Sequence, residues 1–227
     1  GLSWMIESGI RPDTVTFNTL CSAHARMGDA RSALACFHAM IDEGITASST
    51  THAIMVHALV QAGDLAAAEM TLRTLVEQGA QLSASSFNPL VTAYAKKRRT
   101  DLAETVLALM IEAGVEPSMV TFNAIAAAHA SQGDFDSVEK ILAEGASRHG
   151  EAALDRFSYG ALLLSASKKF GFDSPASRQQ VRRLIFSGVQ MNAYLQRLCA
   201  STVRQSFLDE THALQEEQRR AAATAAP

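Results

Sequence analysis

Residues 7–20 read ESGIRPDTVTFNTL, and residues 112–125 read EAGVEPSMVTFNAI. The two stretches lie 105 residues apart, which is three times 35. Glycines mark the copies between them at the same 35-residue spacing: Gly9, Gly44, Gly79 and Gly114. A period of this length is typical of proteins in which one supersecondary unit is stacked many times. The sequence therefore predicts a repeat protein with a 35-residue unit.

Each unit contains a turn signal near its middle. The dipeptide Gly-Asp stands there at residues 28–29, 63–64 and 133–134, and Arg98 replaces the glycine in the third copy. Glycine ends a helix readily in the left-handed conformation, and aspartate begins the next helix as an N-cap. After the turn, small and large apolar residues alternate at i, i+4 and i+7, as in Ala33, Phe37 and Met40. The pattern predicts an all-α fold of stacked helix hairpins.

The 35-residue register divides the chain into segments. We place repeats at 14–48, 49–83, 84–118 and 119–155, a divergent fifth repeat at 156–189, the end of a preceding repeat at 1–13, and a C-terminal capping helix with a frayed tail at 190–227. Apolar spacing predicts one long amphipathic helix from about Asn192 to Arg220. Because the first residue is Gly1 and the opening residues look like the end of a repeat helix, we expect the array to continue upstream.

Composition limits the classes of function. Hydrophobic residues make up 48% of the 227 residues and aromatic residues only 6%, as in packed helices. No apolar run approaches the 18 residues of a membrane span, so we expect no membrane insertion. The three cysteines lack metal-ligand spacing and are expected to be buried thiols. Neither H-E-x-x-H nor G-x-S-x-G occurs, so we expect no enzyme, no metal and no cofactor.

The start and the end of the unit carry further motifs. The start reads V-T-F-N, and the end reads G-[IV]-x-P-[DS], as in GIRPD and GVEPS. With the 35-residue period, these motifs resemble the P-type repeats of the pentatricopeptide repeat family, strongly over residues 7–48 and 84–142. The resemblance implies a right-handed superhelical solenoid of antiparallel helix hairpins. It also implies binding of single-stranded RNA in mitochondria or chloroplasts, with one base facing each repeat.

The resemblance also implies which side chains meet the RNA. In the family these are the fifth and the last residue of a repeat, which here pair Asn18 with Ser48, Ala53 with Ser83, Asn88 with Ser118, and Asn123 with Asp155. The second residue is commonly an aliphatic wedge between bases, which is Val15 in the first repeat and Val120 in the fourth. By family analogy, Asn favours pyrimidines, and Asn with Asp favours uracil.

Two interpretations of these positions remain open. An Asn amide offers a donor and an acceptor to a base edge, and Asn is a mediocre helix former that needs a reason to stand in the first turn. Ser48, Ser83, Ser118 and Asp155, by contrast, precede helices, so N-capping alone would also explain them.

Charge divides unevenly along the chain. Up to Asp155 there are 10 Lys and Arg against 18 Asp and Glu, whereas from Arg156 onward there are 10 against 5. An acidic repeat region is expected to bind RNA weakly unless its cations line the groove. The candidate phosphate ligands are Lys96, Lys97, Arg98, Arg99, Arg182 and Arg183. The first four also suit a solvated loop or a docking site for an acidic partner.

The sequence thus favours a non-enzymatic, pyrimidine-leaning binder of single-stranded RNA that acts in organellar RNA processing, stability or translation. The alternative is a protein scaffold, such as a subunit of an organellar ribosome or another large assembly. The repeated Asn favours RNA, and the acidic repeats favour the scaffold.

Overall fold

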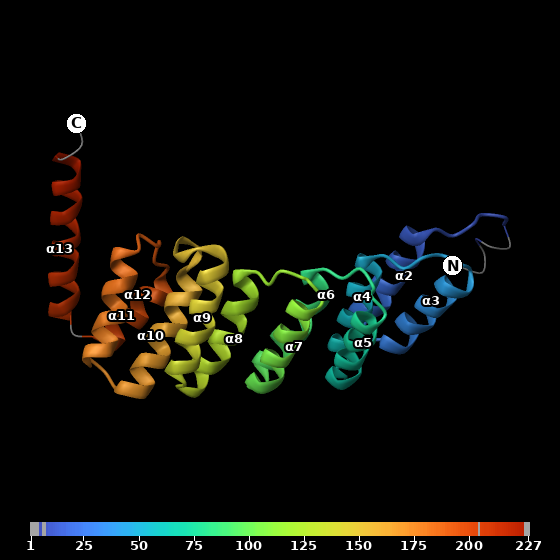
Figure 1. Cartoon of the computed structure of the whole chain (residues 1–227), viewed down its shortest axis with the longest axis horizontal. Helices are drawn as coiled ribbons and strands as arrows, with labels where there is room; N and C mark the ends of the chain where they lie inside the picture. Colours follow the sequence, from blue (N-terminus) through green and yellow to red (C-terminus); the bar gives the residue numbers. More distant parts are fainter. Residues whose placement is uncertain (1–4, 6–7, 204, 225–227) are drawn as a thin grey trace. The chain divides into compact units, whose positions relative to one another are not determined.

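The computed structural model describes residues 5, 8–203 and 205–224, and in these it contains helices and no strand. The all-α prediction is confirmed. The helices are α2 (Thr14–Arg26), α3 (Ala30–Asp42), α4 (Ser49–Gln61), α5 (Leu65–Glu77), α6 (Ala84–Lys96), α7 (Thr100–Glu112), α8 (Met119–Gln132), α9 (Phe135–His149), α10 (Arg156–Phe170), α11 (Pro175–Phe186), α12 (Ala193–Thr202) and α13 (Gln205–Thr224), with a short 3-10 turn at Glu151–Ala153 (Figure 1).

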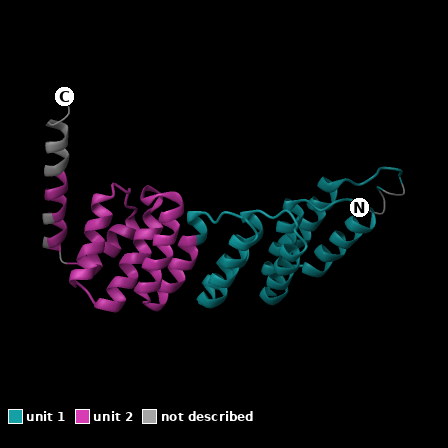
Figure 2. Cartoon of the chain, in the orientation of Figure 1, with its two compact units in different colours: residues 1–121 teal, residues 122–227 magenta. Residues whose placement is uncertain are grey.

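Two compact units make up the chain, residues 1–121 and residues 122–227 (Figure 2). In the first unit α2 packs against α4 and α4 against α6, so consecutive first helices form a layer. Each second helix covers the first helix of its own hairpin, as α3 covers α2. Stacking of hairpins therefore builds the core, as the apolar stripes predict.

Residues at repeated positions share the same burial. The fourth residue of each first helix is buried in all five repeats: Phe17, His52, Phe87, Phe122 and Tyr159. The small residues Ala33, Ala68, Ala103 and Val138 of the second helices are fully buried. Their size lets paired helices approach closely, which explains why the register tolerates so little variation there.

The hairpin turns follow the predicted chemistry. Gly28, Gly63 and Gly133 adopt positive φ angles of 73°, 82° and 80°. Asp29 caps α3 by accepting from the backbone N–H of Ser32, and Asp64 and Asp134 do the same for α5 and α9. These bonds satisfy backbone donors that the first turn of a helix otherwise leaves unpaired.

The third turn departs from this chemistry at both positions. Arg98 has a φ of 57°, so a residue with a Cβ occupies the left-handed conformation that glycine takes elsewhere. Arg99 stands where the other turns have a capping Asp, and α7 has no side-chain cap. The third hairpin turn is therefore less favourable than its neighbours in both backbone conformation and capping.

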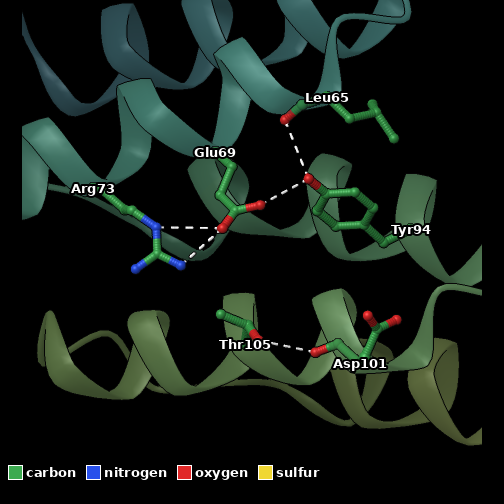
Figure 3. A network of polar contacts seen from close by, with 6 residues as sticks. All are labelled: Leu65, Glu69, Arg73, Tyr94, Asp101 and Thr105. Carbon is green, nitrogen blue, oxygen red and sulfur yellow. Dashed lines mark hydrogen bonds and ion pairs between the residues drawn. The ribbon is translucent and has the colours of Figure 1, made fainter.

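A polar network joins the second and third repeats (Figure 3). Tyr94 in α6 donates to Glu69 Oε2 in α5 at 2.8 Å, and Arg73 donates to Glu69 Oε1 at 2.8 Å. Burial, followed by the bond to Glu69, raises the pKa of Tyr94 to about 12, so the phenol remains a donor at neutral pH. These hydrogen bonds link α5 to α6 at a half-buried site, and they fix how the third hairpin is aligned against the second.

The C-terminal segment differs from the single long helix predicted from Asn192 to Arg220. It forms two helices, because Val203 is extended with φ −134° and ψ 161°. Ser201, Thr202 and Val203 are poor helix formers, which explains a break that the apolar spacing does not reveal. In the second unit α12 packs against α10 and α11, and α13 packs against α11, so both extend the helical stack.

The cysteines fit a structural role. Cys21 and Cys199 are buried and Cys36 is half-buried. Burial raises the pKa of Cys21 and of Cys199 to about 11, which keeps both thiols protonated and unreactive at neutral pH. Across the described residues, no helix is both long and apolar enough to cross a membrane.

Replacing Arg98 with glycine should stabilise the protein by about 1 kcal/mol, because it removes the left-handed strain of a residue with a Cβ. The midpoint of urea unfolding measures the effect. The matched control is Gly63→Ala in the second turn, where no atom lies within 4 Å of an added Cβ, so conformational strain alone should cost about 1 kcal/mol. A lower midpoint for Arg98→Gly would contradict this account.

Candidate nucleic-acid interface

The predicted contact residues lie in the first turn of each first helix. The second residue of each repeat is exposed, and Val15 and Val120 each expose 69% of their surface. The fifth residue, Asn18, Asn88 or Asn123, is half-buried. The first and fourth repeats therefore present an exposed valine in the same turn as a half-buried amide.

Phe157 belongs to this set, although the sequence motifs do not reveal it. It is the second residue of the fifth repeat, and it exposes 59% of its surface. The guanidinium carbon of Arg156 lies 4.9 Å from its ring centroid. The sequence could have pointed to Phe157, because a repeat that starts at residue 156 has Phe157 at its second position, the position that Val120 occupies in the fourth repeat. The fifth position of this repeat is Gly160, which has no side chain to read a base.

The fourth repeat brings its predicted pair together. Asn123 Nδ2 donates to Asp155 Oδ1 at 3.0 Å, and Asn123 Oδ1 accepts from Ser158 Oγ at 2.7 Å. Asp155 also caps α10 by accepting from the backbone N–H groups of Phe157 and Ser158. A capping role and a contact with the fifth residue therefore coexist in one carboxylate.

The other repeats differ from the fourth. Asn88 Oδ1 accepts from Thr121 Oγ1 at 2.8 Å. The Oδ1 atom of Asn18 is buried and has no hydrogen-bond partner among the described residues. Of the four predicted pairs, only Asn123 and Asp155 are joined by a hydrogen bond within the part of the chain that the structure describes.

The serines at the ends of the repeats do not act alike. Ser48 caps α4 in a capping box with Thr51. Ser83 makes no side-chain cap, and its hydroxyl lies 2.8 Å from Ser85 Oγ instead. Ser118 Oγ lies 3.5 Å from Thr121 Oγ1. Capping alone therefore accounts for Ser48 but not for Ser83.

The basic candidates of the first unit lie away from the amides. Lys96, Lys97, Arg98 and Arg99 are exposed in the turn after α6. At 1.5 Å per residue, Lys96 is about 12 Å along α6 from Asn88. Arg99 pairs with Asp101, which belongs to a second helix, at 3.3 Å. The structure therefore places this basic turn at the other end of the first helix from the amide.

The basic candidates of the second unit also pair with residues outside the first turns. Arg183 Nη1 lies 3.7 Å from Glu139 Oε1 in α9. The Arg182 guanidinium carbon lies 5.0 Å from the ring centroid of Phe207 in α13. Within the described residues, no group of His, Cys, Asp or Glu could hold a metal ion.

Comparison with known proteins gives the family. A pentatricopeptide repeat domain model matches residues 70–132, and a PPR repeat family model matches residues 12–61. No curated protein sequence matches.

Solved structures share the fold. The crystal structure of the pentatricopeptide repeat protein PPR10 from maize matches with a TM-score of 0.64 and 22% identity, over 97% of this chain and 31% of that one. The complex of PPR10 with an 18-nt psaJ RNA element matches with a TM-score of 0.62 and 20% identity, over 87% and 27%. The PPR domain of Arabidopsis thaliana protein-only RNase P 1, in complex with tRNA, matches with a TM-score of 0.55 and 19% identity, over 64% and 77%. This chain spans less than a third of the length of PPR10.

Asp155 and Ser83 each end a repeat, but only Asp155 caps a helix, so their substitution should change the free energy of unfolding by different amounts. Asp155→Ala should destabilise the protein by about 1–2 kcal/mol, because it removes the cap of α10. Ser83→Ala is the matched control and should change stability by less than about 0.5 kcal/mol, because Ser83 caps nothing. Equal shifts of the two urea midpoints would show that the capping assignment is wrong.

Proposed function

Because the chain belongs to the pentatricopeptide repeat family, we propose that it binds single-stranded RNA, without catalysing a reaction, through the first turns of its first helices. The observation that carries the proposal is the hydrogen-bonded pair Asn123 and Asp155 beside the exposed ring of Phe157. Polar groups at a base edge and a flat apolar side chain at a base face are the two means by which proteins hold unstacked bases.

The hydrogen-bond donor and acceptor groups of the fourth repeat are arranged in a way that suits uracil. One N–H of Asn123 Nδ2 is given to Asp155, and the second remains for a ligand. Asp155 Oδ2 has no hydrogen-bond partner among the described residues. A donor next to an acceptor complements a carbonyl oxygen next to an N–H group, which is the arrangement at the edges of uracil and guanine, and the family analogy of Asn with Asp favours uracil of these two. Cytosine would place the lone pair of its ring nitrogen against the carboxylate, so we infer that this repeat prefers uracil.

The second residues supply the faces on which bases lie. Val15 and Val120 are apolar and highly exposed, and Phe157 adds an aromatic ring with a guanidinium group over it. Stacking of a base on an aromatic side chain contributes about 1–3 kcal/mol. Exposed apolar side chains occupy this position in three of the five repeats, and the face of a base is a surface on which such side chains can pack.

The net charge of the repeats determines how strongly we expect the protein to bind RNA. Residues 1–155 carry 10 Lys and Arg against 18 Asp and Glu, so few phosphates are neutralised there. We therefore expect a modest affinity, a footprint of about four bases, one per repeat, and strong weakening by salt. Arg156 to Pro227 carries 10 basic against 5 acidic residues, and it is the better candidate for contacts with phosphate.

The biological role that fits such a protein is the processing, stabilisation or translation of a transcript in a mitochondrion or chloroplast. The acidic character of the first four repeats favours a second candidate, a scaffold that holds proteins of a larger complex. The two candidates make opposite predictions for RNA.

The test is fluorescence anisotropy of labelled U-rich and A-rich single strands at low salt. The wild-type protein should bind the U-rich strand more tightly. Changing Asn18, Asn88 and Asn123 together to Ala should weaken that binding at least about tenfold, because the variant has no amide to donate to a base at these three repeats. Gln61→Ala is the control, because it removes an exposed amide from the last residue of α4, at the opposite end of the helix from the first turn, and should leave affinity unchanged.

Two results would contradict the proposal. Equal affinity of the wild-type protein for the two strands would exclude base reading by these residues. Absence of binding to either strand at low salt would favour the scaffold.

A further inference from the structure

A hydroxyl group recurs at the third residue of the first helices. From the second repeat onward these residues are Thr51, Ser86, Thr121 and Ser158, and none exposes more than 2% of its surface. Burial of a hydroxyl is unfavourable unless the group finds a hydrogen-bond partner. Each of these side chains therefore needs an acceptor within the protein.

At two junctions the acceptor is the reading amide of the preceding repeat. Thr121 Oγ1 donates to Asn88 Oδ1 at 2.8 Å in the first unit, and Ser158 Oγ donates to Asn123 Oδ1 at 2.7 Å in the second. In both cases the third residue of one repeat meets the fifth residue of the repeat before it. The same bond in two units indicates a property of the repeat and not of one site.

At the remaining two junctions of the described chain this bond is absent. The second repeat has Ala53 in place of Asn, and the buried Ser86 Oγ has no hydrogen-bond partner within the described residues. At the first junction, the Thr51 hydroxyl pairs with Ser48 in the capping box, and the buried Asn18 Oδ1 has no partner there. Of the three buried side-chain atoms that lack a partner in the described chain, two belong to these interrupted pairs.

The orientation of the amide is determined at the fourth repeat. Ser158 Oγ accepts from the Asp155 backbone N–H at 3.2 Å, and it lies 2.7 Å from Asn123 Oδ1 and 3.2 Å from Asp155 Oδ1, so Asn123 is the nearer acceptor for the hydroxyl hydrogen. The Asp155 carboxylate accepts only, so the atom of Asn123 that faces it is Nδ2. Asn123 Oδ1 therefore faces Ser158, and turning the amide over would place Oδ1 against the Asp155 carboxylate, two acceptors with no hydrogen between them.

We infer that the third-residue hydroxyl, Thr121 or Ser158, is a positioning group that determines base specificity in the preceding repeat. The inference rests on the proposed function. By holding Oδ1 inside the repeat junction, the hydroxyl leaves Nδ2 as the group that meets the base. An amide that is free to turn over offers a donor or an acceptor and discriminates little, whereas a held amide selects a base with an acceptor at that point.

The repeats should therefore differ in stringency. Asn88 and Asn123 are held and should read their bases stringently. Asn18 is not held and should discriminate less. The second repeat has the hydroxyl of Ser86 without an amide to position, so it should be silent, and a single substitution could restore its function.

A double-mutant cycle at the second junction tests the bond without RNA. Ala53→Asn supplies an acceptor to Ser86, and Ser86→Ala removes the donor. Ala53→Asn should raise the urea midpoint more when Ser86 is present than in the Ser86→Ala background. Only the protein with Ser86 can form the hydrogen bond between residues 53 and 86. Absence of coupling between residues 53 and 86 would overturn the inference, whatever the RNA result.

Discrimination between bases tests the specificity role. Thr121→Val keeps the shape of the side chain and removes the hydroxyl, so the ratio of affinities for U-rich and A-rich strands should fall about fivefold or more. Thr121→Ser retains the hydroxyl and should restore the ratio. Thr105→Val is the matched control, because the Thr105 hydroxyl is exposed and bonds to the Asp101 carbonyl of its own helix, α7, which is a second helix outside the proposed interface.

The two proposals can fail separately. An unchanged U to A ratio in Thr121→Val, in a protein that binds RNA, would overturn the positioning role while the RNA-binding function stands. The protein could also show coupling between residues 53 and 86 but bind no RNA. That result would overturn the proposed function, and the hydrogen bond would then have only a structural role at the repeat junction.

Discussion

Each helix hairpin has two apolar faces and can cover only one of them by itself, so the fold depends on stacking one hairpin on the next. This constraint also shapes the candidate interface. Because α2 packs against α4 and α4 against α6, the first turns of consecutive first helices come side by side. The fifth residue of one repeat then meets the third residue of the next, as Asn88 meets Thr121. A period that serves burial thereby brings the fifth residues to equivalent places in the stack, which suits a ligand with one base per repeat.

Stability and recognition share atoms in this arrangement. Asp155 caps α10 and also accepts from Asn123, so a carboxylate that ends one repeat both starts a helix and belongs to the proposed reading pair. Ser48 shares only the first of these roles, because it caps α4 in a capping box with Thr51 while the buried Asn18 Oδ1 has no hydrogen-bond partner among the described residues. The turn at Arg98 is a further departure from the repeat pattern, because a residue with a Cβ adopts the positive φ that glycine has in the other hairpin turns. Effects of substitutions on binding therefore have to be separated from effects on folding.

Local signals made most of the fold predictable from the sequence. Glycine and aspartate at the hairpin turns act within a few residues, and the helices begin and end where those residues predict. The break at Val203 escaped prediction, because apolar spacing continued through residues whose helix propensity is poor. For the proposed interface, the register predicted the pair Asn123 and Asp155, which a hydrogen bond joins, and the same register could have pointed to Phe157. The pairing of Thr121 and Ser158 with the amides could not be read from the sequence, since it depends on contacts between repeats. Asn18 with Ser48 and Asn88 with Ser118 were predicted from the same register, yet the structure gives no hydrogen bond within either of these two pairs in the described part of the chain.

The central claim is that the first turns of the first helices form the surface that holds the bases. Photo-crosslinking with a U-rich strand that carries 4-thiouridine, followed by mass spectrometry of the peptides, tests it most directly. The account predicts crosslinks at the exposed second residues, with Phe157 and Val120 foremost. Crosslinks confined to the turn at residues 96–99, or to the second helices, would contradict it.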